Sequence, residues 1–220
     1  ALPVNLQRSM LREAIRRLRR PLRNINWVHI ENALEVLRAK GTGGSATLPQ
    51  GLMLRIGYDR FTVADEGYCP VFEEWPVLSV PHLALAVPGT TPLPDSPWRV
   101  RMQIVPCEAL PAGWEENADP WQAFLDAERA GSGLALRTRE PGDRFQPLGL
   151  GGHEKSLSEW LINARVPAGL RDRLPLLVSP EHILWVCGGQ IDERVKIRPE
   201  TRRALWIVFA RRTDHGEGKF

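Results

Sequence analysis

The first 40 residues place apolar side chains at the spacing of two amphipathic helices. Leu11 and Ile15 fall on one face of a helix predicted over 5–20. A second helix is predicted to begin at Asn26, because asparagine caps helix N-termini, and to end at Gly41. Its apolar face is predicted to hold Trp27, Ile30, Leu34 and Leu37.

Beyond these helices the spacing changes to that of short strands. Residues 52–56 and 60–65 flank a turn and predict a β-hairpin, which follows a turn-rich loop at 41–50. One more helix is predicted over about 155–164, with Ser156 at a capping position. Further strands are predicted at 82–87, 98–105, 133–139, 175–178, 182–187 and 204–209.

Changes in composition divide the chain into three predicted parts of an α+β fold. Residues 1–68 form a helical module with the hairpin, and residues 133–220 form a small α+β domain. Between them, residues 69–132 are predicted to be a proline-rich connection of short strands that ends in a linker.

The net charge of +3 hides an uneven distribution along the chain. Residues 1–40 hold nine Lys/Arg against three Asp/Glu, residues 41–134 hold five against twelve, and residues 135–220 hold fifteen against eleven. Two basic segments that flank an acidic one suggest a polyanionic partner bound at both ends. Ordinary surface charge is the alternative, and charge alone does not exclude it.

Several classes of function find no support in the sequence. No apolar run reaches the roughly 18 residues of a membrane span, and the N-terminus lacks the apolar core of a signal peptide. The three cysteines form no CxxC pair, which argues against a zinc site and favours a cytoplasmic location. The five histidines show no metal-ligand spacing, and no GxSxG elbow is present. We therefore expect no catalytic residue, metal or cofactor in this chain.

Two glycine-rich segments approach nucleotide-binding loops without completing either motif. Residues 149–156 depart from the GxxxxGK[ST] loop at Glu154, where a carboxylate would repel the phosphate. Residues 42–47 resemble an SGGxDS loop but hold Ala46 at the acidic position. A glycine hinge is the better interpretation of the second segment.

Basic side chains on the first helix are the main positive signal. Arg8, Arg12 and Arg16 recur every four residues on one helical face, and Arg20 extends the set. A guanidinium group can hold a phosphate through two hydrogen bonds, so we predict RNA contacts at these positions. A solvated face, or a face packed on an acidic neighbouring domain, is the alternative.

The C-terminal part supplies a second basic set around aromatic residues. Phe145 follows a Gly-Asp-Arg turn, where it is either exposed for base stacking or buried in the core. Asp143 is more often structural than catalytic in such a turn. The RNA contacts predicted in this part are Arg137, Arg144, Phe145, Lys155, Arg171 and Lys196.

A dense set of motif residues lies within 139–197. These residues are Pro141-Gly142-Asp143-Arg144-Phe145, Pro147-Leu148-Gly149, Lys155, Val166-Pro167, Arg171, Pro175-Leu176-Leu177, Trp185-Val186, Gly188 or Gly189, and Lys196. The set resembles the C-terminal domain of the tRNA(Ile)-lysidine synthetase family. Residues 5–65 resemble the same family's substrate-binding domain through Leu48-Pro49-Gln50-Gly51 and the Tyr58-Asp59 hairpin.

This resemblance implies a role in tRNA modification. Members of this family are ATP-dependent ligases that adenylate the wobble cytidine of an isoleucine tRNA and attach lysine to it. Its N-terminal catalytic domain, which binds ATP, magnesium and lysine, has no counterpart in this sequence, so we expect the chain alone to be inactive. The implied partners are tRNA, whose acceptor stem the C-terminal domain contacts, and the catalytic domain.

Two other classes of function are weighed against this one. A protein-interaction module, such as a homodimer that buries the basic faces, would use the tryptophans and the proline-rich middle. An autonomous enzyme would turn over nucleotide in a reaction that Lys155→Ala abolishes, but the incomplete motifs argue against it.

Overall fold

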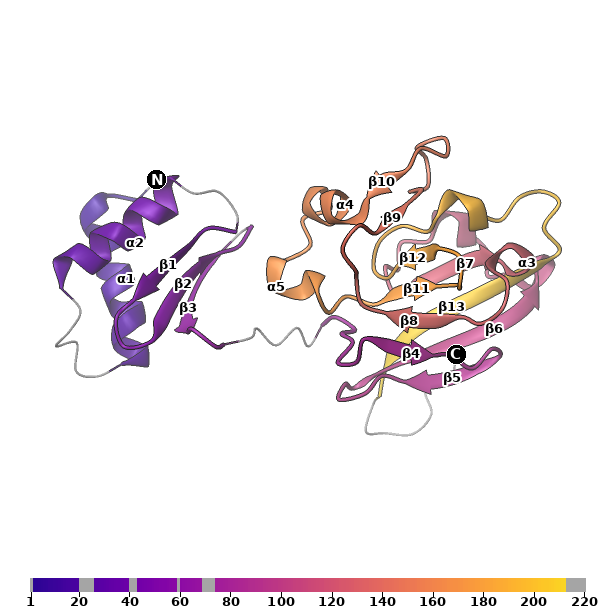
Figure 1. Ribbon diagram of the computed structural model, residues 1–220, viewed down its shortest axis with the longest axis horizontal. Coiled ribbons are helices and arrows are strands. Elements are labelled where there is room, and N and C mark those ends of the chain that lie inside the picture. Colours follow the sequence, from indigo (N-terminus) through magenta and orange to yellow (C-terminus); the bar gives the residue numbers. More distant parts are fainter. Residues whose placement is uncertain (1, 20–25, 40–42, 59, 69–73, 213–220) are drawn as a thin grey trace. The chain divides into compact units, whose positions relative to one another are not determined.

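Two compact units make up the chain. The computed structural model describes residues 2–19, 26–39, 43–58, 60–68 and 74–212. Contacts divide the chain into Ala1–Val71 and Phe72–Phe220 (Figure 1). Both units combine helices with antiparallel strands, so the predicted α+β class is confirmed.

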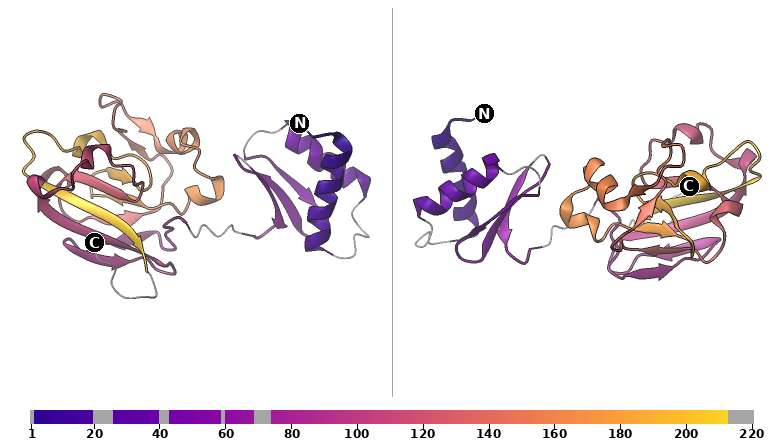
Figure 2. Two further views of the ribbon diagram at one scale, coloured as in Figure 1. Left: turned by 180° about the vertical axis from the view of Figure 1, so that it is seen from behind. Right: turned by 45° about the horizontal axis from the view of Figure 1, so that its top comes forward.

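The first unit packs two helices on one face of a small antiparallel sheet (Figure 2). Its sheet has the order β1-β2-β3. Leu11 and Ile15 meet Leu34 and the strand residues Leu52 and Leu54 in its core. The elements are α1 (Val4–Leu18), α2 (Trp27–Ala39), β1 (Ser45–Leu48), β2 (Leu52–Ile56) and β3 (Phe61–Asp65).

Most of the first unit follows the predicted pattern. The Asn26 side chain accepts a hydrogen bond from the backbone N–H of His29 at 3.3 Å, as expected of a cap. The segment expected as a loop at 41–50 contains β1 instead. It forms a strand because β2 supplies a hydrogen-bonding edge and the core accepts Leu48.

The second unit is built from two four-stranded antiparallel sheets. The first has the order β12-β11-β8-β4 and the second the order β5-β6-β13-β7. The strands of the first are β4 (His82–Ala84), β8 (Ala135–Arg137), β11 (Leu176–Val178) and β12 (Ile183–Val186). The strands of the second are β5 (Gly89–Pro92), β6 (Trp98–Pro106), β7 (Gln122–Asp126) and β13 (Arg203–Arg211).

A hairpin and short helices complete the second unit. The hairpin joins β9 (Arg144–Phe145) to β10 (Lys155–Ser156). Ser156 precedes α4 as predicted, but its side chain makes no capping hydrogen bond. The α-helices are α3 (Ala127–Ala130), α4 (Leu157–Asn163) and α5 (Ala168–Arg171), and the 3-10 helices are η1 (Cys107–Ala109), η2 (Trp114–Glu116) and η3 (Glu193–Val195).

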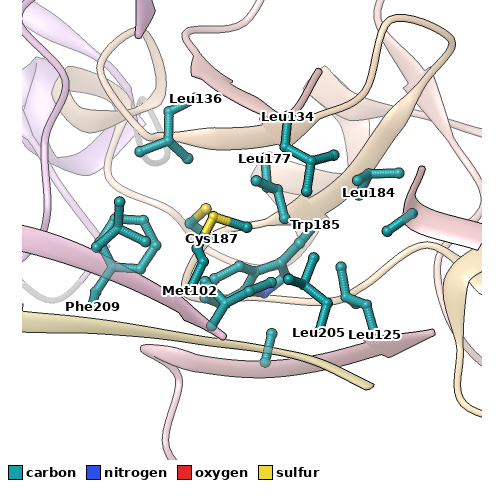
Figure 3. Packing of buried hydrophobic residues seen from close by; sticks show 14 of the residues in the cluster. Met102, Leu125, Leu134, Leu136, Leu177, Leu184, Trp185, Cys187, Leu205 and Phe209 are labelled. Carbon is teal, nitrogen blue, oxygen red and sulfur yellow. The ribbon is translucent and has the colours of Figure 1, made fainter. Parts of the chain in front are cut away.

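The main core of the second unit lies between its two sheets. Leu136 and Leu177 of the first sheet face Met102 and Leu205 of the second (Figure 3). Trp185 is 1% exposed and lies at the centre of this cluster. A smaller cluster, which includes Phe145, Leu157 and Leu161, joins α4 and α5 to the outer face of the first sheet.

The proline-rich middle is part of this core, not a connection between domains. β4 pairs with β8, and β13 pairs with both β6 and β7. The predicted boundary between 69–132 and 133–220 is therefore wrong. β4, β6 and β7 pair with strands that are distant in sequence. Local sequence patterns do not reveal such pairings.

Candidate nucleic-acid interface

The first predicted set of cations lies on α1 and is partly neutralised. Arg12 is exposed and forms no ion pair within the described residues. Arg8 donates from Nε to Glu31 Oε1 at 2.5 Å. Arg16 makes two hydrogen bonds to Glu13, at 2.6 and 2.8 Å. The three arginines, called here the α1 arginine face, thus carry different amounts of uncompensated charge.

Glu13 is the acidic centre of α1. It also accepts a hydrogen bond from Arg17 at 3.0 Å. The hydrogen bonds from Arg16 and then Arg17 lower the pKa of Glu13 to about 2. This carboxylate therefore stays charged throughout the physiological range and competes with phosphate for two guanidinium groups. The predicted contact Arg20 lies outside the described residues.

Trp27 does not lie where the sequence pattern placed it. The helical spacing put it on the apolar face of α2, whereas its side chain is 65% exposed. The Arg8 guanidinium lies over its ring, 5.8 Å from the ring centroid. The expectation was wrong because Trp27 is the first residue of α2, whereas the buried residues of this helix begin one turn later, at Ile30.

Arg137 is a structural residue in the second unit. Two of its nitrogens donate to Asp143, each at 2.8 Å, and the two side chains are only 17% and 12% exposed. Burial disfavours the charged form of Asp143, but the hydrogen bonds from Arg137 and from the Glu140 backbone outweigh it and hold its pKa below the ordinary value. Such a pair fixes the Pro-Gly-Asp turn and is poorly placed for RNA contact.

Phe145 is buried completely, so burial in the core, and not exposure for base stacking, is the correct one of the two alternatives. Its side chain is 0% exposed and meets Trp160 edge to face, with ring centroids 5.7 Å apart. The reason is strand alternation: Arg144 points outward on β9, so the next side chain points into the core.

Arg144, Lys155 and Lys196 form exposed or half-exposed ion pairs with nearby carboxylates. Arg144 pairs with Glu154 at 3.2 Å, and these side chains are 54% and 50% exposed. Lys155 lies 3.7 Å from Glu159, and Lys196 pairs with Glu193. Water screens such pairs, so their cations remain accessible to a competing anion.

The structure gathers further cations around α4 and α5. Arg139 pairs with Asp172 at 2.6 Å and donates to Ser158 on α4. Arg171 donates from Nε to the Val166 carbonyl at 2.9 Å. Arg165 is exposed in the turn between the helices and forms no ion pair within the described residues. We call Arg139, Lys155, Arg165 and Arg171 the α4–α5 basic surface.

Arg139 and Arg165 were not among the predicted contacts. Both contributed to the basic charge of this part of the sequence, but spacing alone gave no reason to group them with Lys155 or Arg171. Arg165 lies in the connection between α4 and α5 at a φ of 57°, and Arg139 contacts Ser158 on α4 and Asp172 directly after α5.

The glycine-rich loop at 149–152 does not fit a nucleotide phosphate. It links β9 to β10 of a hairpin. The Gly149 N–H donates to the Glu193 carboxylate at 3.2 Å, so an internal anion occupies this backbone donor. Within the described residues, no three His, Cys, Asp or Glu side chains are grouped to hold a metal ion.

No helix among the described residues combines the length and apolar character needed to cross a membrane.

Known proteins resemble this chain in both sequence and fold. Residues 134–207 match the family described as the TilS substrate C-terminal domain. A crystal structure of a TilS C-terminal domain superimposes with a TM-score of 0.51 and 26% identity, over 60% of this chain and 98% of that one.

Curated relatives extend the similarity to almost the whole chain. The tRNA(Ile)-lysidine synthase of Dehalococcoides mccartyi is 35% identical over 93% of this chain, and that of Symbiobacterium thermophilum is 34% identical over 98%. The matches cover 41% and 43% of those proteins, so the chain spans about two fifths of their length.

Proposed function

The chain carries a TilS substrate C-terminal domain within a region similar to tRNA(Ile)-lysidine synthases, and from this premise we propose that it binds tRNA. The observation that carries the proposal is the match at 134–207, because the α4–α5 basic surface lies within that segment. The α1 arginine face would supply a second contact, and the acceptor stem is the proposed ligand of the second unit.

Ion pairing is the main physical objection to this proposal. A guanidinium locked against a buried carboxylate cannot contact phosphate without a large cost. Arg137 falls in that class, but Arg144 is 54% exposed and can exchange its carboxylate partner for phosphate at little cost. Arg12 and Arg165 need no such exchange.

The proposal extends to a whole protein of which this chain forms a part. That protein would be a ligase of tRNA modification that attaches lysine to the wobble cytidine of an isoleucine tRNA. Its ATP, magnesium and lysine would be bound by an N-terminal catalytic domain, and the residues described here would position the tRNA.

A titration with tRNA at several salt concentrations tests the proposal. The full chain should bind at low salt, with affinity that falls as salt rises. Arg12→Gln and Arg165→Gln should each reduce the log–log salt slope by about 0.7–0.9, the value for one lost phosphate contact. Arg211→Gln removes the same charge at the end of β13, outside both basic surfaces, and should leave the slope nearly unchanged.

The proposal fails if the chain shows no affinity for tRNA at low salt. It also fails if affinity is indifferent to salt, because phosphate contacts would then contribute nothing. An equal effect of all three substitutions would indicate nonspecific attraction by net charge instead of defined contact surfaces.

A protein-contact role is the second candidate, favoured by exposed apolar residues on α1. Leu6 and Met10 are 47% and 54% exposed, one helical turn apart, on the side of α1 opposite Leu11 and Ile15. Light scattering on the purified chain separates the candidates. A stable dimer that excludes tRNA would favour this role, whereas a monomer that binds tRNA would oppose it.

A further inference from the structure

Trp27 stands apart from the other seven tryptophans of the chain, all of which lie in the described part. It is 65% exposed, whereas the other seven are buried or half-buried. Each of those seven also contacts another aromatic ring. The pairs are Trp75–Trp121, Trp98–Trp121, Trp114–Phe124, Phe124–Trp206, Phe145–Trp160 and Trp185–Phe209. Trp27 therefore contributes little to a core.

The indole of Trp27 is nevertheless held in place from one side. The Arg8 guanidinium lies over the ring at 5.8 Å from its centroid, a distance typical of a cation–π contact. Arg8 is itself fixed by Glu31, one turn along α2 from Trp27. With one face covered by Arg8, an exposed fraction of 65% leaves the opposite face open to solvent.

A second arginine lies one turn along α1 from the one that covers the ring. Arg12 follows Arg8 by four residues, is exposed, and forms no ion pair within the described residues. An open aromatic face next to an uncompensated arginine is the arrangement that binds single-stranded nucleic acid: the ring stacks on a base while the cation meets the backbone. Paired bases are already stacked, so only an unpaired base can use such a face.

We infer that Trp27 is a stacking platform for an unpaired nucleobase of RNA, with Arg12 contacting the adjoining phosphate. The inference rests on the proposed RNA-binding function and adds a specific contact to it. A protein partner is less suited to this position, because polar groups surround Trp27 in the fold: Arg8 lies over the ring, Glu31 pairs with Arg8, and the cap residue Asn26 precedes Trp27 in the chain.

Two substitutions in the full chain test the inference. Trp27→Phe keeps an aromatic face, whereas Trp27→Leu keeps apolar bulk without one. Trp27→Leu should weaken binding of a single-stranded RNA oligonucleotide roughly 5- to 100-fold, the effect of losing one stacked base, and Trp27→Phe should retain most of the affinity. Binding of a fully paired RNA duplex should be the same for all three proteins.

Fluorescence gives an independent readout, because Trp27 is the only strongly exposed indole in the described part of the chain. The single-stranded oligonucleotide should quench part of the fluorescence of the unsubstituted chain, and this quenching should be absent in Trp27→Phe. Thermal melting should be nearly the same in all three proteins, since an exposed side chain contributes little to stability.

The outcomes separate this inference from the proposed function. If Trp27→Leu binds single-stranded RNA as tightly as the unsubstituted chain, or loses duplex affinity equally, the stacking platform is refuted while RNA binding stands. If the unsubstituted chain binds neither RNA, the proposed function is refuted together with the inference.

Discussion

Close packing of two tryptophans explains the two glycines of the Gly188-Gly189 motif. A Cβ on Gly189 would lie 2.2 Å from Trp160 Cη2, and one on Gly188 would lie 2.6 Å from Trp121 Cζ3. Gly188 also has a φ of +81°, which other residues rarely adopt. The resemblance left open which of the two glycines matters, and the structure indicates that both do.

Gly189→Ala should therefore destabilise the second unit by about 1–3 kcal/mol, the usual cost of overpacking. Chemical denaturation measures this change. Trp160→Leu should relieve the clash, so the double variant should lose less stability than the two single changes combined. Gly67→Ala is the control, because its added methyl group meets open space. Additive effects at 160 and 189 would contradict the packing explanation.

Asp192 is the most deeply buried carboxylate of the described residues. It is 0% exposed and accepts hydrogen bonds from the Gln146 N–H at 2.8 Å and from Arg194 Nε at 2.8 Å. Burial opposes its ionisation, but the hydrogen bonds from Arg194 and Gln146 outweigh that effect and hold its pKa below the ordinary value. The carboxylate thereby connects Gln146, directly after β9, to Arg194 in η3 through hydrogen bonds.

The lowered pKa of Asp192 makes the stability that these hydrogen bonds provide sensitive to acid. The stabilisation is fully present above the unfolded pKa of about 3.9 and is lost as pH falls through the lower folded value. Asp192→Asn should reduce the free energy of unfolding at neutral pH by about 2 kcal/mol, and should flatten its decline below about pH 4. Glu154→Gln, in a half-exposed pair, should cost less than about 1 kcal/mol. Equal effects of the two changes would show that burial does not set the difference.

Which carboxylate meets which cation could not be predicted at the residue scale. Arg137 and Asp143 are close in sequence, but nothing in the pattern distinguished their buried pair from the exposed pair of Arg144 and Glu154. That distinction depends on strands packed around each pair. Charge alone therefore identified the candidate RNA contacts. Only the folded structure shows which of these side chains solvent or RNA can reach.

At the scale of elements, the local sequence pattern predicts those helices and strands whose formation depends mainly on their own residues. Both helices of the first unit form where their apolar spacing predicts, although Trp27 departs from the predicted face, and β6 follows the alternation of Val100 and Met102. β5 was not predicted, because its residues Gly89–Pro92 lack an apolar pattern and form a strand only by pairing with β6. β1 was missed for the same reason.

The single acidic residue of α1 offers an element-scale test of RNA binding. Glu13→Gln removes the carboxylate that holds Arg16 and Arg17. If these arginines face phosphate, the substitution should steepen the log–log salt slope by roughly 0.7–0.9 and raise tRNA affinity at about 0.1 M salt by up to roughly tenfold.

Glu35→Gln on α2 is the matched control for this measurement. It removes the same charge, but Glu35 forms no ion pair with a described residue. A similar gain from both substitutions would show that net charge, and not the release of two arginines, controls affinity. No gain from Glu13→Gln would place Arg16 and Arg17 outside the RNA contact.

At the scale of the whole molecule, the boundary of the second unit is the main departure from the sequence prediction. The family match begins at 134, close to the predicted boundary at 133. The match to the solved TilS C-terminal domain, however, covers 60% of this chain, about twice the share that residues 134–207 make up. It must include residues outside that segment, which agrees with the pairing of β4, β6 and β7 to later strands.

Two shortened chains test where the second unit begins. Residues 72–220 keep both sheets, so they should melt cooperatively on their own. Residues 133–220 lose β4 together with β5, β6 and β7, which leaves β13 without either neighbour and exposes Leu205, Ile207 and Phe209 to water. Burial of such side chains stabilises a fold by about 1.5–3 kcal/mol each, which is a large share of a small domain's stability. The shorter chain should therefore give no cooperative transition in circular dichroism and should be digested rapidly by protease. Cooperative melting of 133–220 would instead show that the C-terminal strands form a core without the proline-rich middle.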